Sequence, residues 1–192
     1  GVNFLFFEKD WQVEAGLKTI IFNDNARLTY DHLINCAGLQ ADKVAQKFNV
    51  GNFYTMLPFK GSYWQFKKDS PFKFTTNLYP VPDLEIPFLG VHVTPSIDGV
   101  TYLGPTAVPA MGRENYKGMK GADPILILNF IRHMATQVAR DKKMRNYVKN
   151  QAFDWTPKFF LNAAKLIIPK VEMNHIERSN KVGIRPKLYD LK

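Results

Sequence analysis

The residues best suited to chemistry gather in the middle of the chain. They form three blocks: Leu57-Pro58-Phe59-Lys60-Gly61-Ser62-Tyr63-Trp64, Leu78-Tyr79-Pro80-Val81-Pro82-Asp83 and Pro87-Phe88-Leu89-Gly90-Val91-His92-Val93-Thr94. Aromatic rings, a lysine and a histidine alternate here with glycines, as expected where a sheet face directs polar groups into an apolar cavity. Ordinary core packing around a hydrogen-bonded histidine explains the pattern equally well. Periodicity alone leaves both interpretations open.

Several common chemistries have no signature in the sequence. None of the 12 glycines forms G-x-G-x-x-G, and neither G-x-x-x-x-G-K-[ST] nor G-x-S-x-G occurs. The four histidines are widely spaced and Cys36 is the single cysteine, so no metal site and no internal disulfide are expected. Gly118-Met119-Lys120-Gly121 matches the G-x-x-G loop of an RNA-binding module, although a plain solvent loop explains it better.

The composition suits a folded domain of 192 residues that are 45% hydrophobic. Lys and Arg number 26 against 17 Asp and Glu, a formal charge of +9 that favours anionic partners without identifying one. Because the lysines are scattered, solvation is the simpler explanation. The apolar runs are too short to span a membrane, and both ends read like interrupted structure, so we expect a fragment of a longer protein.

Two groups of elements must position these residues. Residues 2–7, 10–15, 17–22 and 27–30 predict a β-meander, followed by a buried strand at 33–38 and a helix at 41–48. Antiparallel strands are then expected at the following ranges: 54–67, 72–81, 87–94 and 100–105. Residues 95–99, with Asp98-Gly99 as turn chemistry, predict a hairpin between the last two strands.

Helices and a final strand complete the prediction. Asp123-Pro124 is a typical N-cap and first helical residue for a helix over 125–149. Ile125, Leu128 and Ile131, followed by Met134, Ala135 and Val138, would form its apolar face, and basic residues at 140–145 its solvated end. A helix at 157–168 and an extended strand at 181–186 follow. The fold class is therefore α+β.

Seven ordered blocks between residues 35 and 186 resemble the L-2-hydroxyglutarate oxidase/dehydrogenase family, within the FAD-dependent superfamily that includes D-amino-acid oxidase. The blocks are Asn35-Cys36-Ala37-Gly38-Leu39-Gln40-Ala41-Asp42, Pro58-Phe59-Lys60-Gly61-Ser62-Tyr63, Tyr79-Pro80-Val81-Pro82, Pro87-Phe88-Leu89-Gly90-Val91-His92-Val93-Thr94, Gly104-Pro105-Thr106-Ala107, Arg113-Glu114-Asn115-Tyr116 and Gly183-Ile184-Arg185-Pro186. The family's Arg-Gly-Glu-Tyr block reads Lys60-Gly61-Ser62-Tyr63 here, so any role of its Glu does not carry over.

The resemblance implies a domain organisation and a cofactor. Residues 1–50 would belong to the Rossmann-like FAD-binding lobe, 51–182 would form an antiparallel substrate-binding lobe with flanking helices, and 183–192 would return to the FAD-binding lobe. FAD would be the cofactor of the full-length protein. Because the family's N-terminal G-x-G-x-x-G is missing, we expect this chain alone to hold no FAD and to be inactive.

The resemblance also implies roles for single residues. Arg185 would bind the substrate carboxylate with its forked guanidinium, and Lys60 a second carboxylate. His92, whose ordinary pKa of about 6.5 suits a general base, would take the hydroxyl proton. Tyr63 and Tyr79 would donate hydrogen bonds to the developing oxo group. Cys36, Ala37, Gly38 and Leu39 would pass close to FAD, because glycine allows close backbone approach.

The expected function is oxidation of a 2-hydroxy acid, with L-2-hydroxyglutarate as the first candidate, to the 2-oxo acid. An electron acceptor such as oxygen or a quinone would be the second partner, and nucleic acid would not be one. The expected location is the cytoplasm, with peripheral association at the inner membrane left open. Two alternatives remain: a catalytically silent binding domain of the same ancestry, and a basic nucleic-acid-binding module built on residues 118–121.

Overall fold

The computed structural model describes residues 1–6, 10–81, 90–140 and 156–191, and the chain divides into two compact units. Unit 1 comprises Gly1–Met56 with Leu188–Lys192, and unit 2 comprises Leu57–Lys187. Each unit contains an antiparallel sheet with few helices, so the chain has the mixed α+β class predicted from its sequence.

Unit 1 contains a three-stranded meander. Strands β1 (Trp11–Glu14), β2 (Thr19–Phe22) and β3 (Arg27–Thr29) pair in that order, with a short 3-10 turn at Ala15–Leu17. This confirms the last three strands of the predicted meander. The prediction of a strand at 2–7 is wrong for residues 2–6, which pair with no other described strand and expose their large apolar side chains. Residue 7 lies outside the described residues.

The segment before the first helix also differs from the prediction. Residues 33–38 form no strand, and the Ile34 side chain is 85% exposed, because no described strand pairs with this apolar run. A 3-10 turn (Gly38–Gln40) leads into α1 (Ala41–Lys47), which confirms the predicted helix. Asp42 of α1 contacts the strand that follows the helix, because its buried carboxylate accepts a hydrogen bond of 2.8 Å from the Met56 amide.

The sheet of unit 2 has the order β5-β6-β4-β7, and β8 also pairs with β4. The strands are β4 (Tyr54–Phe66), β5 (His92–Pro95), β6 (Thr101–Gly104), β7 (Val108–Pro109) and β8 (Ile176–Asp190). The predicted hairpin between β5 and β6 is confirmed, and Gly99 takes a left-handed φ of 81° in its turn. Residues 87–89 lie outside the described residues.

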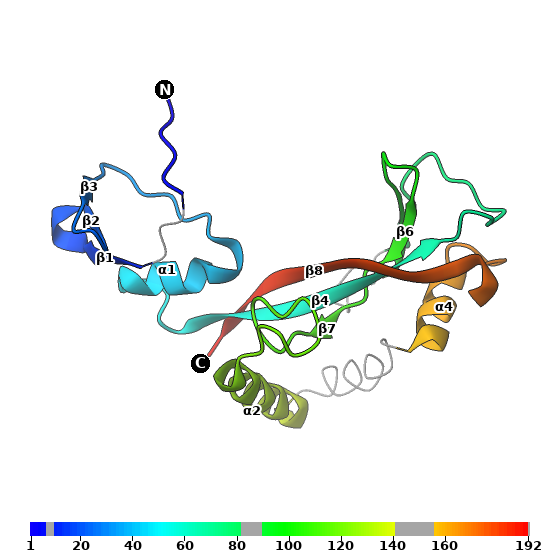
Figure 1. Ribbon diagram of the computed structural model, residues 1–192. Coiled ribbons are helices and arrows are strands. Elements are labelled where there is room, and N and C mark those ends of the chain that lie inside the picture. Colours follow the sequence, from blue (N-terminus) through cyan, green and yellow to red (C-terminus); the bar gives the residue numbers. More distant parts are fainter. Residues whose placement is uncertain (7–9, 82–89, 141–155, 192) are drawn as a thin grey trace. The chain divides into compact units, whose positions relative to one another are not determined.

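Strand β8 brings the C-terminal part of the chain against β4 (Figure 1). Gln65 donates a hydrogen bond of 2.8 Å to Glu177, and Arg178 lies over the ring of Trp64. Residues later in β8 therefore lie against earlier residues of β4, as in an antiparallel pair. The strand is longer than the predicted range of 181–186.

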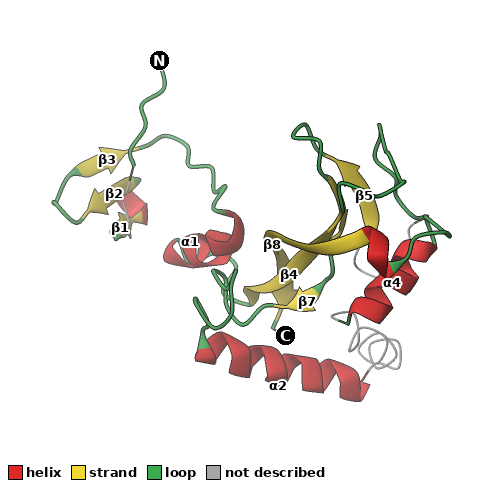
Figure 2. Cartoon of the chain, turned by 45° about the vertical axis from the view of Figure 1, so that its right-hand side comes forward, coloured by secondary structure: helices red, strands yellow, loops and turns green. Residues whose placement is uncertain are grey.

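The hydrophobic core lies on one face of this sheet, under α4 (Pro157–Lys165) (Figure 2). Phe160 of α4 stacks on Trp64 with ring centroids 5.5 Å apart, and Val93 and Leu103 are fully buried beside it. Residues 72–81, predicted as a strand, contribute only a bridge from Leu78 to Val93. The rings of Phe72 and Phe74 instead pack on the ring of Phe66. This part of the segment is therefore held by side-chain packing and not by regular strand pairing.

Helix α2 (Pro124–Arg140) begins as predicted, because the Asp123 carboxylate accepts hydrogen bonds of 3.0 Å from the amides of residues 125 and 126. Its orientation differs from the prediction. Ile125, Leu128 and Ile131 are more than half exposed, whereas Leu126 is buried and Phe130 packs on Phe59. The helix is apolar on several sides, so periodicity did not identify the inward one. Its predicted continuation over 141–149, which includes all of the predicted basic cluster at 140–145 except Arg140, lies outside the described residues.

Candidate functional site

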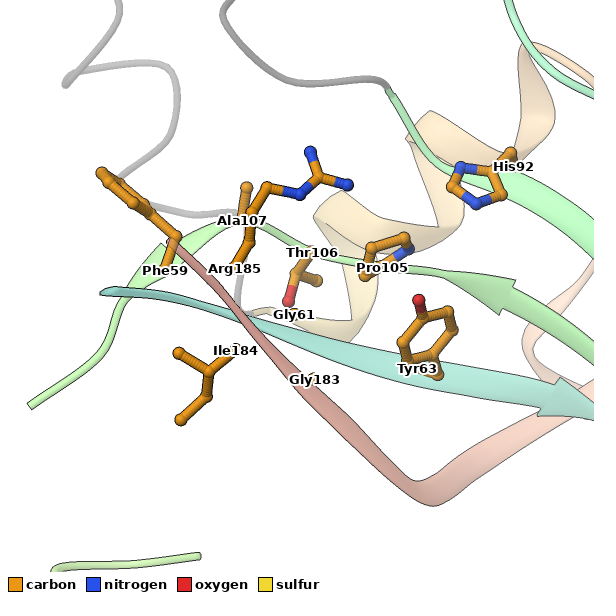
Figure 3. A pocket seen from close by; sticks show the side chains of 10 residues that line it. All are labelled: Phe59, Gly61, Tyr63, His92, Pro105, Thr106, Ala107, Gly183, Ile184 and Arg185. Atoms are coloured by element: carbon orange, nitrogen blue, oxygen red, sulfur yellow. The ribbon is translucent and has the colours of Figure 1, made fainter. Parts of the chain in front are cut away.

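A pocket of about 220 Å³ lies in unit 2 (Figure 3). It is formed by β4, by the segment between β6 and β7, by the start of β5 and by β8. Its lining residues are Phe59, Gly61, Tyr63, His92, Pro105, Thr106, Ala107, Gly183, Ile184 and Arg185. A pocket of this size suits a small organic acid.

Strand alternation explains which side chains reach the pocket. Successive side chains of a strand point to opposite faces, so Phe59, Gly61 and Tyr63 share one face of β4. On β5 the neighbour Val93 is buried in the core, which directs His92 to the opposite face. One face of the sheet therefore makes the core while the other makes the pocket.

Gly61 allows one wall of the pocket to approach β4 closely. A Cβ atom at this glycine would lie 2.6 Å from Cβ of Pro105 and 3.0 Å from the carbonyl oxygen of Thr106. The hydroxyl of Thr106 accepts a hydrogen bond of 3.1 Å from the Ser62 amide, which fixes the approach. Sequence reasoning did not assign Phe59, Pro105 or Thr106 to the site, although all three lie in the resemblance blocks.

His92 has a defined hydrogen-bonding state. Its Nδ1 lies 3.2 Å from the carbonyl oxygen of Gly90, and because a carbonyl only accepts, the neutral ring carries its proton on Nδ1. The Nε2 lone pair is then available as a base, and the imidazole faces the pocket (Figure 3). Partial burial lowers the pKa of His92, the Gly90 carbonyl opposes this change, and the positive charge of Arg185 lowers the pKa further.

Arg185 supplies a positive charge to the pocket from β8. Its side chain is exposed, and the guanidinium points toward the side of the pocket where His92 lies (Figure 3). No carboxylate among the described residues forms an ion pair with it. Tyr63 completes this group, its ring packed edge-to-face on Tyr102 at 6.3 Å with Lys181 5.4 Å from its centroid. The structure thus brings Arg185, His92 and Tyr63 together.

The other predicted site residues lie elsewhere. Lys60 belongs to the opposite face of β4 from Phe59, Gly61 and Tyr63, and burial lowers its pKa. Tyr79 lies against the ring of His92 and is not among the pocket-lining residues.

The segment Cys36-Ala37-Gly38-Leu39 belongs to unit 1. Its first three residues are exposed. Gly38 has a left-handed φ of 51° and open space where a Cβ would be.

The G-x-x-G match at 118–121 has a packing explanation. A Cβ on Gly121 would lie 2.4 Å from the Glu114 carbonyl oxygen, so this glycine is required for close backbone packing. The buried Asn115 amide donates hydrogen bonds to the carbonyls of Gly118 and Lys120 at 2.7 and 2.9 Å. Gly118 has open space where a Cβ would be, but it takes a left-handed φ of 51°, so turn geometry favours glycine there while packing requires it at Gly121.

A comparison with protein-family models shows to which family the chain belongs. Residues 7–191 match the model described as FAD dependent oxidoreductase. The chain belongs to this FAD-dependent family. The match confirms the resemblance seen in the sequence blocks.

Curated relatives of this family member are named L-2-hydroxyglutarate dehydrogenase. The protein of Indibacter alkaliphilus is 31% identical over 179 residues, which cover 90% of this chain and 43% of that protein. The mitochondrial protein of Nematostella vectensis is 40% identical over 111 residues, which cover 56% of this chain and 24% of that protein. The mitochondrial protein of Caenorhabditis elegans is 47% identical over 85 residues, which cover 44% of this chain and 20% of that protein. These matches span less than half of each relative.

Residues 36–38 leave room for a large group to approach the chain closely. All three residues are exposed, residue 37 is an alanine, and nothing lies within 4 Å of the position that a Cβ on Gly38 would take. Two further findings concern the described residues alone. They include no helix both long and apolar enough to cross a bilayer, and no group of three metal-ligating side chains.

Proposed function

We propose that this chain supplies the substrate-binding unit of an FAD-dependent oxidoreductase that converts a 2-hydroxy acid, most specifically L-2-hydroxyglutarate, to the 2-oxo acid. The supporting observation is the convergence of a guanidinium, a neutral imidazole and a phenol on one small pocket. The names of the relatives support the choice of acid.

Each of the three side chains has a distinct task in this proposal. Arg185 binds the C1 carboxylate through two parallel N–H···O hydrogen bonds, the contact for which a guanidinium is shaped. The His92 Nε2 accepts the proton of the substrate hydroxyl, because the Gly90 carbonyl holds the other ring nitrogen protonated. Tyr63 donates a hydrogen bond to the same substrate oxygen and orients it.

The cofactor supplies the redox step. When bound, FAD would supply the hydride acceptor for carbon 2 of the acid; loss of that hydride together with the hydroxyl proton would convert the alcohol to a ketone. Residues 36–39 of unit 1 are the residues of this chain that we propose to contact FAD, because 36–38 are exposed and Gly38 leaves open space where a Cβ would be. The Rossmann-like character of unit 1 and an acceptor such as oxygen or a quinone belong to the same proposal.

Flavin reduction tests the proposal directly. The oxidoreductase that contains this unit, purified with its flavin, is mixed without oxygen with L-2-hydroxyglutarate, D-2-hydroxyglutarate or L-lactate, and the visible flavin absorbance is followed. We expect bleaching with the first acid and formation of 2-oxoglutarate. If fully loaded flavin stays oxidised with all three acids, the chain is a silent binding domain. Peroxide formation on re-oxidation would distinguish oxygen from a quinone as acceptor.

A further inference from the structure

The ring of Tyr79 lies against the imidazole of His92. The two ring centroids are 4.8 Å apart and the planes are inclined by 32°. Backbone pairing places them side by side: Leu78 and Val93 exchange hydrogen bonds of 3.0 and 2.9 Å. In an antiparallel pairing the residue after Leu78 lies beside the residue before Val93, so the contact follows from the backbone.

A second contact holds the same segment in place. A Cβ at Gly90 would lie 3.2 Å from Cγ of Pro80, so the segment carrying Tyr79 packs closely on the segment leading to His92. The carbonyl of this same Gly90 is the partner of the His92 Nδ1. The stacking ring and the hydrogen-bond acceptor of His92 therefore come from one local structure.

We propose that Tyr79 is a positioning residue for His92. The aromatic ring of Tyr79, rather than its hydroxyl, holds the His92 imidazole with Nε2 toward the pocket. Tyr79 is 54% exposed and lies outside the pocket lining, so its hydroxyl is poorly placed to contact a substrate. The proposal rests on the function proposed above for His92, but it makes a separate prediction about the orientation and solvation of the imidazole.

The surroundings of His92 define what its titration reports. Among the described residues, the charged or titratable groups near it are Arg185 on β8, Tyr63 on β4 and Tyr79 itself, and Lys181 lies over the rings of Tyr63 and Tyr102. Burial is the largest cause of the lowered pKa of His92. Removal of the Tyr79 ring admits water to one face of the imidazole, so the pKa should rise.

The first experiment measures histidine tautomers and titration by NMR on the 192-residue chain, with the His92 signals assigned through His92→Gln. We expect the wild type, Tyr79→Phe and Tyr79→Trp to keep the proton on Nδ1 with similar titration midpoints. Tyr79→Leu should raise the midpoint measurably, because loss of the ring exposes one face of the imidazole to water and removes part of the burial that disfavours the protonated form. Tyr116→Leu, a similarly exposed tyrosine outside the pocket, is the control.

The second experiment measures turnover in the flavin-loaded oxidoreductase that contains this chain. Tyr79→Leu should lower kcat about 3- to 10-fold with KM unchanged within twofold, and Tyr79→Phe should restore wild-type kcat. An unchanged His92 titration in Tyr79→Leu refutes the proposal, and so does a Tyr79→Phe variant as impaired as Tyr79→Leu. A wild type that fails to oxidise any 2-hydroxy acid would refute the proposed function while leaving the NMR result intact.

Discussion

Arg185→Met removes the positive charge of the pocket while keeping an unbranched side chain of similar reach. Hydrogen bonds to a charged group contribute about 1.5–3 kcal/mol. Because the Arg185 side chain is exposed, we expect the loss to lie within this range rather than at the larger values of a fully buried pair. At 1.4 kcal/mol per tenfold, kcat/KM for L-2-hydroxyglutarate should fall roughly 10- to 150-fold. Arg185→Lys should recover part of this loss, since an ammonium cannot make the forked contact.

The assay is flavin-dependent dye reduction at several substrate concentrations, with bound flavin measured in every variant. Arg178→Met is the matched control, because Arg178 lies on the same strand and contacts Trp64 but does not line the pocket. It should change kcat/KM less than twofold. If Arg185→Met with full flavin content falls less than about fivefold, or no further than Arg178→Met, Arg185 does not bind the carboxylate.

Three further predictions follow from the packing and charge of the pocket. Gly61→Ala should lower the free energy of unfolding by about 1–3 kcal/mol in a denaturant titration, because the new Cβ would overlap Pro105. Gly183→Ala is the control and should change the free energy of unfolding little, because nothing lies within 4 Å of the position of its Cβ. Equal losses in the two variants would contradict the packing argument. When kcat/KM is plotted against pH, the midpoint of the acidic limb should lie below about 6.5, because burial and the charge of Arg185 both disfavour protonated His92. In Arg185→Met this midpoint should move to higher pH. An unmoved acidic limb would exclude His92 as the base. Lys60→Met should change kcat/KM for L-2-hydroxyglutarate less than twofold because Lys60 lies on the other face of β4, whereas a tenfold loss that spares L-lactate would identify it as the second carboxylate's partner.

Local sequence signals predicted the elements whose cause is local. The Asp98-Gly99 turn defines the β5–β6 hairpin, and Asp123 caps α2 where its side chain can reach two amides. The apolar run at 33–38 failed as a strand prediction, because a strand also needs a partner that local composition does not reveal. The face of α2 was misjudged for a related reason, since its sequence is apolar in more than one direction.

The site was predictable only in part. Arg185, His92 and Tyr63 were identified through family blocks, because nothing in their spacing shows that β8 returns to β4. The placement of Lys60 was accessible from strand alternation, since it lies an odd number of residues from Tyr63. The stacking of Tyr79 on His92 depends on a single backbone bridge, which leaves no sequence signature.

The pairing of β8 with β4 also determines when the pocket forms during synthesis. Gln65 and Glu177, which bond across this pair, are separated by 112 positions, and Arg185 is made later still. At about 5–20 residues per second, a ribosome needs roughly 6–22 s to make the intervening chain. During this interval β4 has a free edge on the side that β8 will occupy, so a nascent chain paused before Ile176 exposes a strand open to pairing with another chain. Yield should therefore depend on translation speed and chaperone supply as well as on final stability.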